Sequence, residues 1–247
     1  MQRQLSSDQV REFYHDNFVA DQVRDFLALV GPAPAEGAGA GAIVADIGGG
    51  CGFFARALQG RSGWRARVLD MDPVSVRTCQ QHDVQARVAD ALKPEIAGDE
   101  SVVSFNLMLH HLVGKTAAQT RALQLQALRA WALQAPRVFV NEYIYESFGV
   151  RSASGWLIYA VTSSQALSWL AQAVARVVPS LRANTFGVGV RFRGADEWIA
   201  LFREAGYDLV ASRRGHEERV SLARRLLLIR SCRRDSFLLR ATSAPSP

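Results

Sequence analysis

The sequence feature that most constrains the fold is the stretch 42–58, AIVADIGGGCGFFARAL. Apolar residues that favour β-structure end at Asp46, glycines then dominate the next positions, and the chain resumes in residues compatible with a helix. This order predicts a buried strand, a tight turn and a helix start. Glycines let a ligand approach the main chain, and free N–H groups at a helix start face that ligand. The stretch therefore predicts a ligand-binding turn.

The spacing of the glycines indicates which ligand fits the turn. Gly48, Gly50 and Gly52 form G-x-G-x-G. The dinucleotide fingerprint G-x-G-x-x-G instead needs glycine or alanine where this chain has Phe53. The spacing therefore disfavours a pyrophosphate ligand.

The segment 46–52 resembles the first motif of the class I methyltransferases that use S-adenosyl-L-methionine (SAM). The resemblance covers about 43–145 and, more weakly, the chain from 195 onward. It implies an α/β fold with a Rossmann-like, doubly wound, mostly parallel seven-stranded sheet. The expected division is an N-terminal helical cap at 1–35 and a methyltransferase domain at 36–247, with a helical lid insertion after the fifth strand at 147–193. The alternative is a structural turn in another α/β protein.

Acidic residues follow the next predicted strands. Asp70 ends a strand predicted at 67–70, where a carboxylate can accept both ribose hydroxyl groups. Asp72 precedes a proline and fits a helix N-cap, so Asp70 is the favoured ribose ligand; the alternative is that both are turn residues. Asp90 and Ala91, after the third predicted strand, resemble the position that meets the adenine amino group. Asp90 fits an ordinary loop acid equally well.

The fourth predicted strand, 102–105, runs into the sequence NLMLHHL at 106–112. This sequence resembles the fourth motif of methyltransferases that act on small molecules, and it is not the Asn-Pro-Pro-Tyr type of enzymes that methylate amino groups in DNA and protein. Ligands collect at the carboxyl ends of parallel strands, where these candidate residues fall. The expected cofactor-binding residues are Asp46, Gly48, Gly50, Gly52, Asp70, Asp90, Ala91 and Asn106.

Methyl transfer to oxygen is helped by a general base, and the sequence offers three candidates. His110 and His111 follow the fourth strand, and histidine titrates near working pH. The alternative is a histidine that only hydrogen-bonds its own loop. Glu142, at the end of a fifth strand predicted at 137–145, is the next choice.

Composition bears on partners and location. The formal charge is +6 and the pI about 9.7, but the basic residues are nearly all arginines in short, scattered runs, which disfavours a nucleic-acid partner. Three isolated cysteines and no cluster of ligand side chains predict neither a disulfide framework nor a metal site. The N-terminus has no apolar signal region, so we expect a cytoplasmic protein.

The insertion breaks the alternation of strands and helices. It carries no charged residue from 152 to 175 and is rich in apolar side chains, so we expect Trp156, Tyr159 and Trp169 to be mostly buried. Polar residues in its middle argue against a transmembrane span. A lid, a homodimer contact and a membrane-surface element remain alternatives. Arg182, Arg191 and Arg193 come after the uncharged part of the insertion, either to bind a substrate anion or to be solvated.

Two terminal regions complete the prediction. Helices are expected from Ser6 and over 19–30, either covering the substrate side or packing on the sheet. Strands at 226–230 and 236–240 are expected to pair across a turn at 233–235 as a closing antiparallel edge.

The function that this reading favours is methyl transfer from SAM to a small-molecule acceptor at oxygen or nitrogen, as in natural-product biosynthesis. The resemblance implies SAM as the cofactor. The alternatives are an RNA or protein methyltransferase, and a non-catalytic SAM-binding partner subunit.

Overall fold

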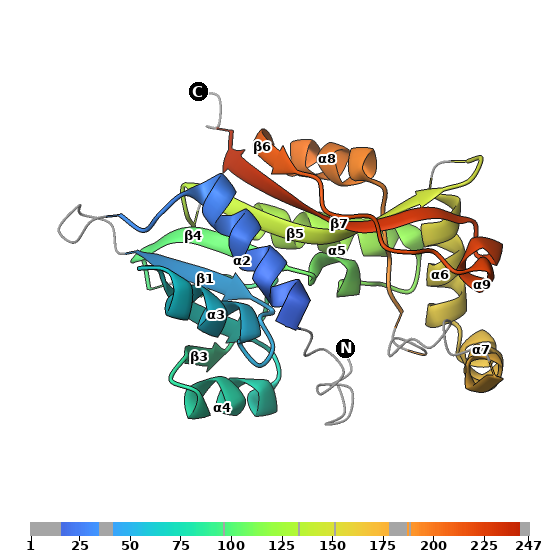
Figure 1. Ribbon diagram of the computed structural model, residues 1–247, viewed down its shortest axis with the longest axis horizontal. Coiled ribbons are helices and arrows are strands. Elements are labelled where there is room, and N and C mark those ends of the chain that lie inside the picture. The colour runs from blue at the N-terminus through green and yellow to red at the C-terminus, as the bar shows by residue number, and fades with distance from the viewer. Residues whose placement is uncertain are drawn as a thin grey trace.

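The computed structural model describes residues 16–34, 42–95, 97–132, 134–150, 152–177, 187 and 189–242. Within these residues the chain forms a seven-stranded sheet in the order β3-β2-β1-β4-β5-β7-β6 (Figure 1). The first five strands pair in parallel, and β7 runs antiparallel to both β5 and β6. The predicted doubly wound, mostly parallel sheet is confirmed. The strands are β1 Ile43–Ile47, β2 Arg65–Asp70, β3 Gln85–Val88, β4 Glu100–Asn106, β5 Arg137–Ser147, β6 Tyr207–Arg213 and β7 Ile229–Ala241.

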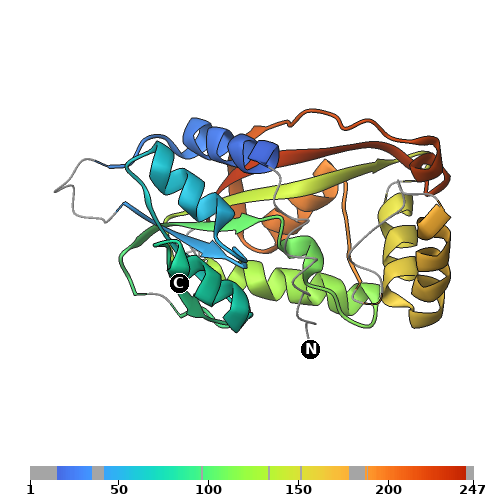
Figure 2. The same ribbon diagram turned by 60° about the horizontal axis from the view of Figure 1, so that its bottom comes forward.

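Helices cover both faces of the sheet. On one face lie α2 (Asp16–Val30), α3 (Phe53–Arg61) and α4 (Pro73–Gln81), and on the other lie α5 (Ala117–Trp131) and α8 (Ala195–Glu204). The insertion forms α6 (Ala153–Ser163) and α7 (Gln165–Val177) at one end of the molecule, beside the short helix α9 (Leu222–Leu226) (Figures 1 and 2). No helix in the described ranges is long and apolar enough to cross a bilayer.

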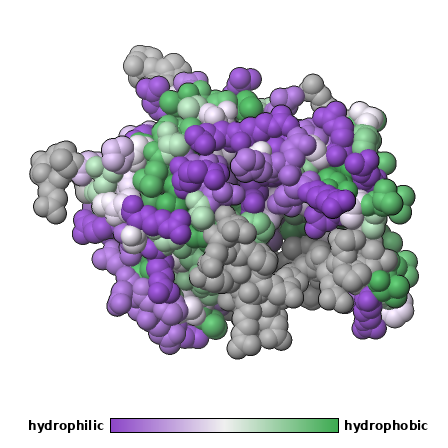
Figure 3. Space-filling model, in the orientation of Figure 1, coloured by the Kyte–Doolittle hydropathy of each residue, from purple (hydrophilic) through white to green (hydrophobic). Residues whose placement is uncertain are grey.

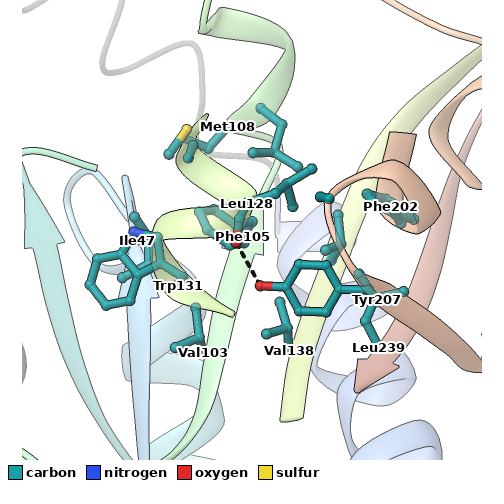
Figure 4. Close-up of a cluster of buried hydrophobic side chains, with 14 of the residues drawn as sticks. Ile47, Val103, Phe105, Met108, Leu128, Trp131, Val138, Phe202, Tyr207 and Leu239 are labelled. Carbon is teal, nitrogen blue, oxygen red and sulfur yellow. Dashed lines mark hydrogen bonds between the residues drawn. The ribbon is translucent and has the colours of Figure 1, made fainter. Parts of the chain in front are cut away.

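The core under α5 and α8 shows why the strands are so apolar. Ile47 and Phe105, from neighbouring strands, are fully buried beside Trp131 of α5 (Figure 4). The Tyr207 hydroxyl donates to the Leu128 carbonyl at 2.7 Å, so its polar atom is satisfied inside the core. Strands covered by helices on both faces must be apolar on both, which explains the continuous burial of β1.

The expected C-terminal hairpin is wrong. Residues 226–230 and 236–240 do not form two paired strands: the chain from Ile229 to Ala241 is one strand, β7, between β5 and β6. The polar triplet at 233–235 indicated a turn, but its charges are satisfied within the sheet. Arg233 Nε donates to Asp235 at 3.0 Å, and the Gly215 amide donates to Asp235 at 2.9 Å. Compensated charges therefore let the strand continue.

Helix α2 packs on the sheet, which decides between its two predicted placements. Phe26 is fully buried, with its ring edge-on to Phe54, Trp64 and Phe139 at 5.2 to 5.7 Å between centroids. Gly31, with φ 92°, ends the helix as predicted. The helix expected from Ser6 lies largely outside the described residues, and the division at residue 35 stays a prediction.

Replacing Phe26 with alanine tests this packing. Phe26→Ala removes an aromatic side chain from a filled core and leaves a cavity, so the free energy of unfolding should fall by about 3 to 5 kcal/mol. Phe148→Ala, at a half-exposed phenylalanine, is the matched control and should cost less than about 1 kcal/mol. Urea denaturation measures both. Equal small losses would show that α2 is a detachable cap.

Candidate functional site

The glycine turn after β1 has the geometry that its sequence predicts. Gly48, Gly50 and Gly52 have φ of 66°, 54° and 75°, in the left-handed region that side chains rarely adopt. A Cβ on Gly52 would lie 2.8 Å from the sulfur of Cys79 in α4, and one on Gly49 would collide with the Asp46 carboxylate. The turn can therefore close against the sheet only with glycines, and it leads directly into α3 at Phe53.

Asp70 ties this turn to the tip of β2. One carboxylate oxygen accepts from the Gly50 amide at 2.9 Å, and the other accepts from the Asp72 amide at 2.8 Å. Burial raises the pKa of Asp70, and these two hydrogen bonds lower it in part. Asp72 caps α4, accepting from the Val74 and Ser75 amides, as its sequence context predicts. Each Asp70 oxygen keeps a lone pair for a ligand hydroxyl group.

Asp46 and Asn106 form a buried polar pair beneath the turn. The Asn106 amide donates to Asp46 at 2.9 Å and to Ser104 at 2.7 Å. Asp46 is fully buried, and this burial raises its pKa to about 7 despite the bond from Asn106. The second carboxylate oxygen of Asp46 and the amide oxygen of Asn106 have no hydrogen-bond partner within the described part of the protein. The Asn106 oxygen is an acceptor, and the Asp46 oxygen donates when the carboxyl group is protonated and accepts when it is ionised, so a ligand or water could satisfy both.

Asp90 and Ala91 lie after β3, beside Asp70. Asp90 accepts from the Leu92 amide at 2.9 Å and so builds its own turn, and the Ala91 carbonyl accepts from Trp131 at 2.7 Å. The Ala89 amide donates to the Asp70 carbonyl, which keeps the two strand ends together. Asp90 thus has a local structural role as well as a position at the carboxyl edge of the sheet.

His110 and Glu142, predicted separately, form one unit. Both are buried, and His110 Nδ1 lies 2.7 Å from the Glu142 carboxylate. Glu142 also accepts from the Leu109 amide at 2.7 Å and from the His110 amide at 3.3 Å. A carboxylate with these donors accepts the Nδ1 proton and leaves Nε2 as the basic atom, a tautomer inferred from the bonding partners. Glu142 therefore orients the imidazole.

Aromatic rings surround this pair. Phe192 stacks on Tyr145 at 4.3 Å between centroids and lies 4.9 Å from His110, and His111 is 4.2 Å from His110. Burial and the neighbouring His110 lower the pKa of His111 well below its ordinary value, which keeps its ring neutral. Burial raises the pKa of Tyr143 to about 12. The aromatic wall, defined as His111, Tyr143, Tyr145 and Phe192, is therefore uncharged near neutral pH.

The sequence analysis named Arg191 and Arg193 but did not predict that their segment completes this wall. Where β4 ends, residues 190–193 run beside β5: the Arg191 amide donates to the His110 carbonyl at 2.9 Å, and the Tyr145 amide donates to the Arg193 carbonyl at 3.0 Å. Arg193 also donates twice to Gln124, whose amide bonds the Leu109 carbonyl at 3.0 Å. Single polar residues without a motif carry no sequence signal for such contacts.

One expectation about the insertion is wrong, and one of the two alternatives for Arg191 and Arg193 is excluded. Trp156 and Trp169 are 58% and 73% exposed, and of the three aromatic residues expected inside only Tyr159 is buried, with its hydroxyl bonded to the Gly114 carbonyl. Arg191 and Arg193 are both buried, so neither is solvated, and Arg193 donates to Gln124. Anion binding by these arginines stays a prediction, and Arg182 lies outside the residues that the structure describes. The uncharged character of the insertion misled the prediction, because apolar residues here face outward.

No group of three or more histidine, cysteine, aspartate or glutamate side chains within the described ranges is arranged to hold a metal ion. The three cysteines are free.

Solved structures share this fold. A LepI variant in complex with SAH and a substrate analogue is 14% identical with a TM-score of 0.54, over 88% of this chain and 46% of that one. Geranyl diphosphate C-methyltransferase from Streptomyces coelicolor A3(2) is 10% identical with a TM-score of 0.55, over 90% and 77%. Human N-acetylserotonin methyltransferase is 16% identical with a TM-score of 0.55, over 96% and 55%.

These similarities show that the chain has the fold of SAM-dependent methyltransferases. The chain spans about half the length of LepI. No protein-family model matches the sequence, and a search of curated proteins found no match.

The raised pKa of Asp46 predicts a pH dependence of stability. The folded state keeps a proton on Asp46 from about pH 4 to 7, whereas the unfolded chain has released it. The free energy of unfolding should therefore fall as pH rises through this range, by about 4 kcal/mol from this group. Asp46→Asn cannot ionise and should gain stability relative to the wild type by that amount between about pH 4 and pH 8. Urea denaturation measures both proteins across this pH range. If their free energies of unfolding changed with pH in parallel, Asp46 would not have the raised pKa.

Proposed function

We propose that this protein transfers the methyl group of SAM to a small-molecule acceptor by in-line displacement. The observation that carries the proposal is the juxtaposition, at one edge of the sheet, of the glycine turn with Asp70 and the His110–Glu142 pair. The fold of the similar solved structures supports it.

The residues present fit the cofactor. The turn faces open space at Gly50, where an added Cβ would meet no atom within 4 Å, and one buried Asp46 oxygen has no hydrogen-bond partner among the described residues. The Asp70 carboxylate would accept the ribose hydroxyl groups, and Asp90, Ala91 and Asn106 would complete the cofactor site. The sulfonium of SAM supplies the leaving group and so the reactive methyl.

His110 and the aromatic wall would handle the acceptor. His110 Nε2 accepts the proton of an acceptor hydroxyl group, and Glu142 stabilises the imidazolium that forms. The aromatic wall offers flat apolar surface, which suits a planar acceptor and excludes water. For an amine acceptor the same wall would position the nitrogen and no base would be needed.

The remaining parts of the proposal concern partners and location. The basic residues are arginines in short runs scattered along the sequence, and some of them, such as Arg67 with Asp99 and Arg24 with Asp21, are paired with acids. This scattering supports a small-molecule acceptor over RNA. A cytoplasmic location and a homodimer remain predictions.

Asp70→Ala tests the cofactor site. Loss of the carboxylate removes two charge-assisted hydrogen bonds to the ribose, so S-adenosylhomocysteine should bind roughly 100-fold more weakly in calorimetry. Asp72→Ala is the matched control in the same loop: it removes the cap of α4, costs about 1 kcal/mol of stability and should leave the dissociation constant unchanged. An unchanged dissociation constant in Asp70→Ala, together with weaker binding in Asp72→Ala, would show that Asp70 is not the ribose ligand.

His110→Ala tests the acceptor site. For an oxygen acceptor, turnover should fall about 100-fold or more while S-adenosylhomocysteine affinity stays the same. Glu142→Gln should also lower turnover, because a neutral amide does not stabilise imidazolium. His216→Ala, at an exposed histidine, is the control and should leave turnover unchanged. A wild-type rate in His110→Ala would show that the acceptor reacts without this base.

A further inference from the structure

Exposed apolar side chains gather at the end of the molecule formed by α6, α7 and α9. We call this the end patch and define it by six large residues that are more than half exposed: Trp156, Trp169, Leu170, Val177, Leu222 and Leu226. These helices lie together in both ribbon views, and hydrophobic colour gathers along the same side of the space-filling view (Figures 1, 2 and 3). Apolar surface so concentrated marks an interaction site.

Helix α7 differs from an ordinary amphipathic helix because its apolar stripe faces solvent. Its apolar residues at 167, 170, 174 and 177 repeat at helical spacing, yet all are exposed. The polar Ser168 is buried instead, donating to the Val161 carbonyl at 2.8 Å and accepting from the Gly187 amide at 2.9 Å. The side of α7 that carries Ser168 thus faces the protein, and the apolar stripe faces outward.

The charge around the end patch indicates which kind of partner it would bind. The sequence contains no aspartate or glutamate from 147 to 195 or from 219 to 234. Arg176, Arg219, Arg225 and Arg230 are exposed on α7 and around α9. A second copy would bring the same positive charge to the contact, whereas an anionic lipid surface would attract it.

We propose that the end patch docks this protein on the surface of an anionic membrane. Helices with tryptophan and leucine on the apolar side and arginine on the polar side lie in the headgroup region without spanning the bilayer. Tryptophan prefers that interface, and Trp156 and Trp169 are both in the patch. The proposal does not depend on the methyl-transfer reaction.

The distribution of tryptophans provides a direct test. Trp64, Trp131 and Trp198 are buried, so only Trp156 and Trp169 can change environment at a surface. Vesicles of phosphatidylcholine with about a third phosphatidylglycerol should shift the tryptophan emission to shorter wavelength, and pure phosphatidylcholine should do so far less. No shift with either vesicle, or an equal shift with both, would overturn the proposal.

Vesicle sedimentation with variants separates the two contributions. Arg225→Gln and Arg230→Gln should each weaken partitioning about fivefold, and Trp169→Ser with Leu170→Ser should abolish it. Two matched controls should bind as the wild type does: Val210→Ser changes an exposed valine on β6, and Arg56→Gln changes an exposed arginine on α3. Sedimentation velocity on the same proteins tests the other occupant. If the wild type is a dimer that Trp169→Ser breaks, and it does not bind vesicles, the end patch binds a second copy and the proposal is wrong.

Discussion

The geometry of the candidate site depends on the bond between the Gly50 amide and the Asp70 carboxylate, which joins the glycine turn to the tip of the neighbouring strand. The Gly48 amide adds a bond to the Leu69 carbonyl at 2.7 Å, and Gly52 packs against Cys79. Positive φ at these glycines lets the chain reverse within a few residues and start α3. The carboxyl ends of the strands consequently open onto one shared edge, where the candidate site lies.

The acceptor side is built by extending β5 beyond its parallel neighbour. Strand β4 stops at Asn106, opposite Asn141, whereas β5 continues to Ser147 along β7. The loop after β4 folds back so that His110 meets Glu142, and residues 190–193 occupy the space that β4 vacates. A base, its orienting carboxylate and an aromatic wall thus come from three separate segments of the chain.

The alternation of the first five strands with helices, the glycine turn, the cap at Asp72 and the end of α2 could be predicted, because each depends on the local sequence pattern. The joining of His110 with Glu142 could not, because it depends on register between β4 and β5. The charged triplet at 233–235 suggested a turn, because the groups that satisfy its charges, such as the Gly215 amide, are distant in sequence and could not be identified there. The tryptophans of α6 and α7 suggested a core, because composition does not indicate which side a helix presents.

The fold alone does not define the reaction, since one of the solved structures that share it is described as a pericyclic reaction enzyme. The central claim is that the glycine turn and Asp70 hold an adenosyl group without a pyrophosphate. Calorimetric titration of the wild-type protein with S-adenosylhomocysteine and, separately, with NAD tests it most directly. We expect one site for S-adenosylhomocysteine and none for NAD. Binding of NAD without S-adenosylhomocysteine would contradict it.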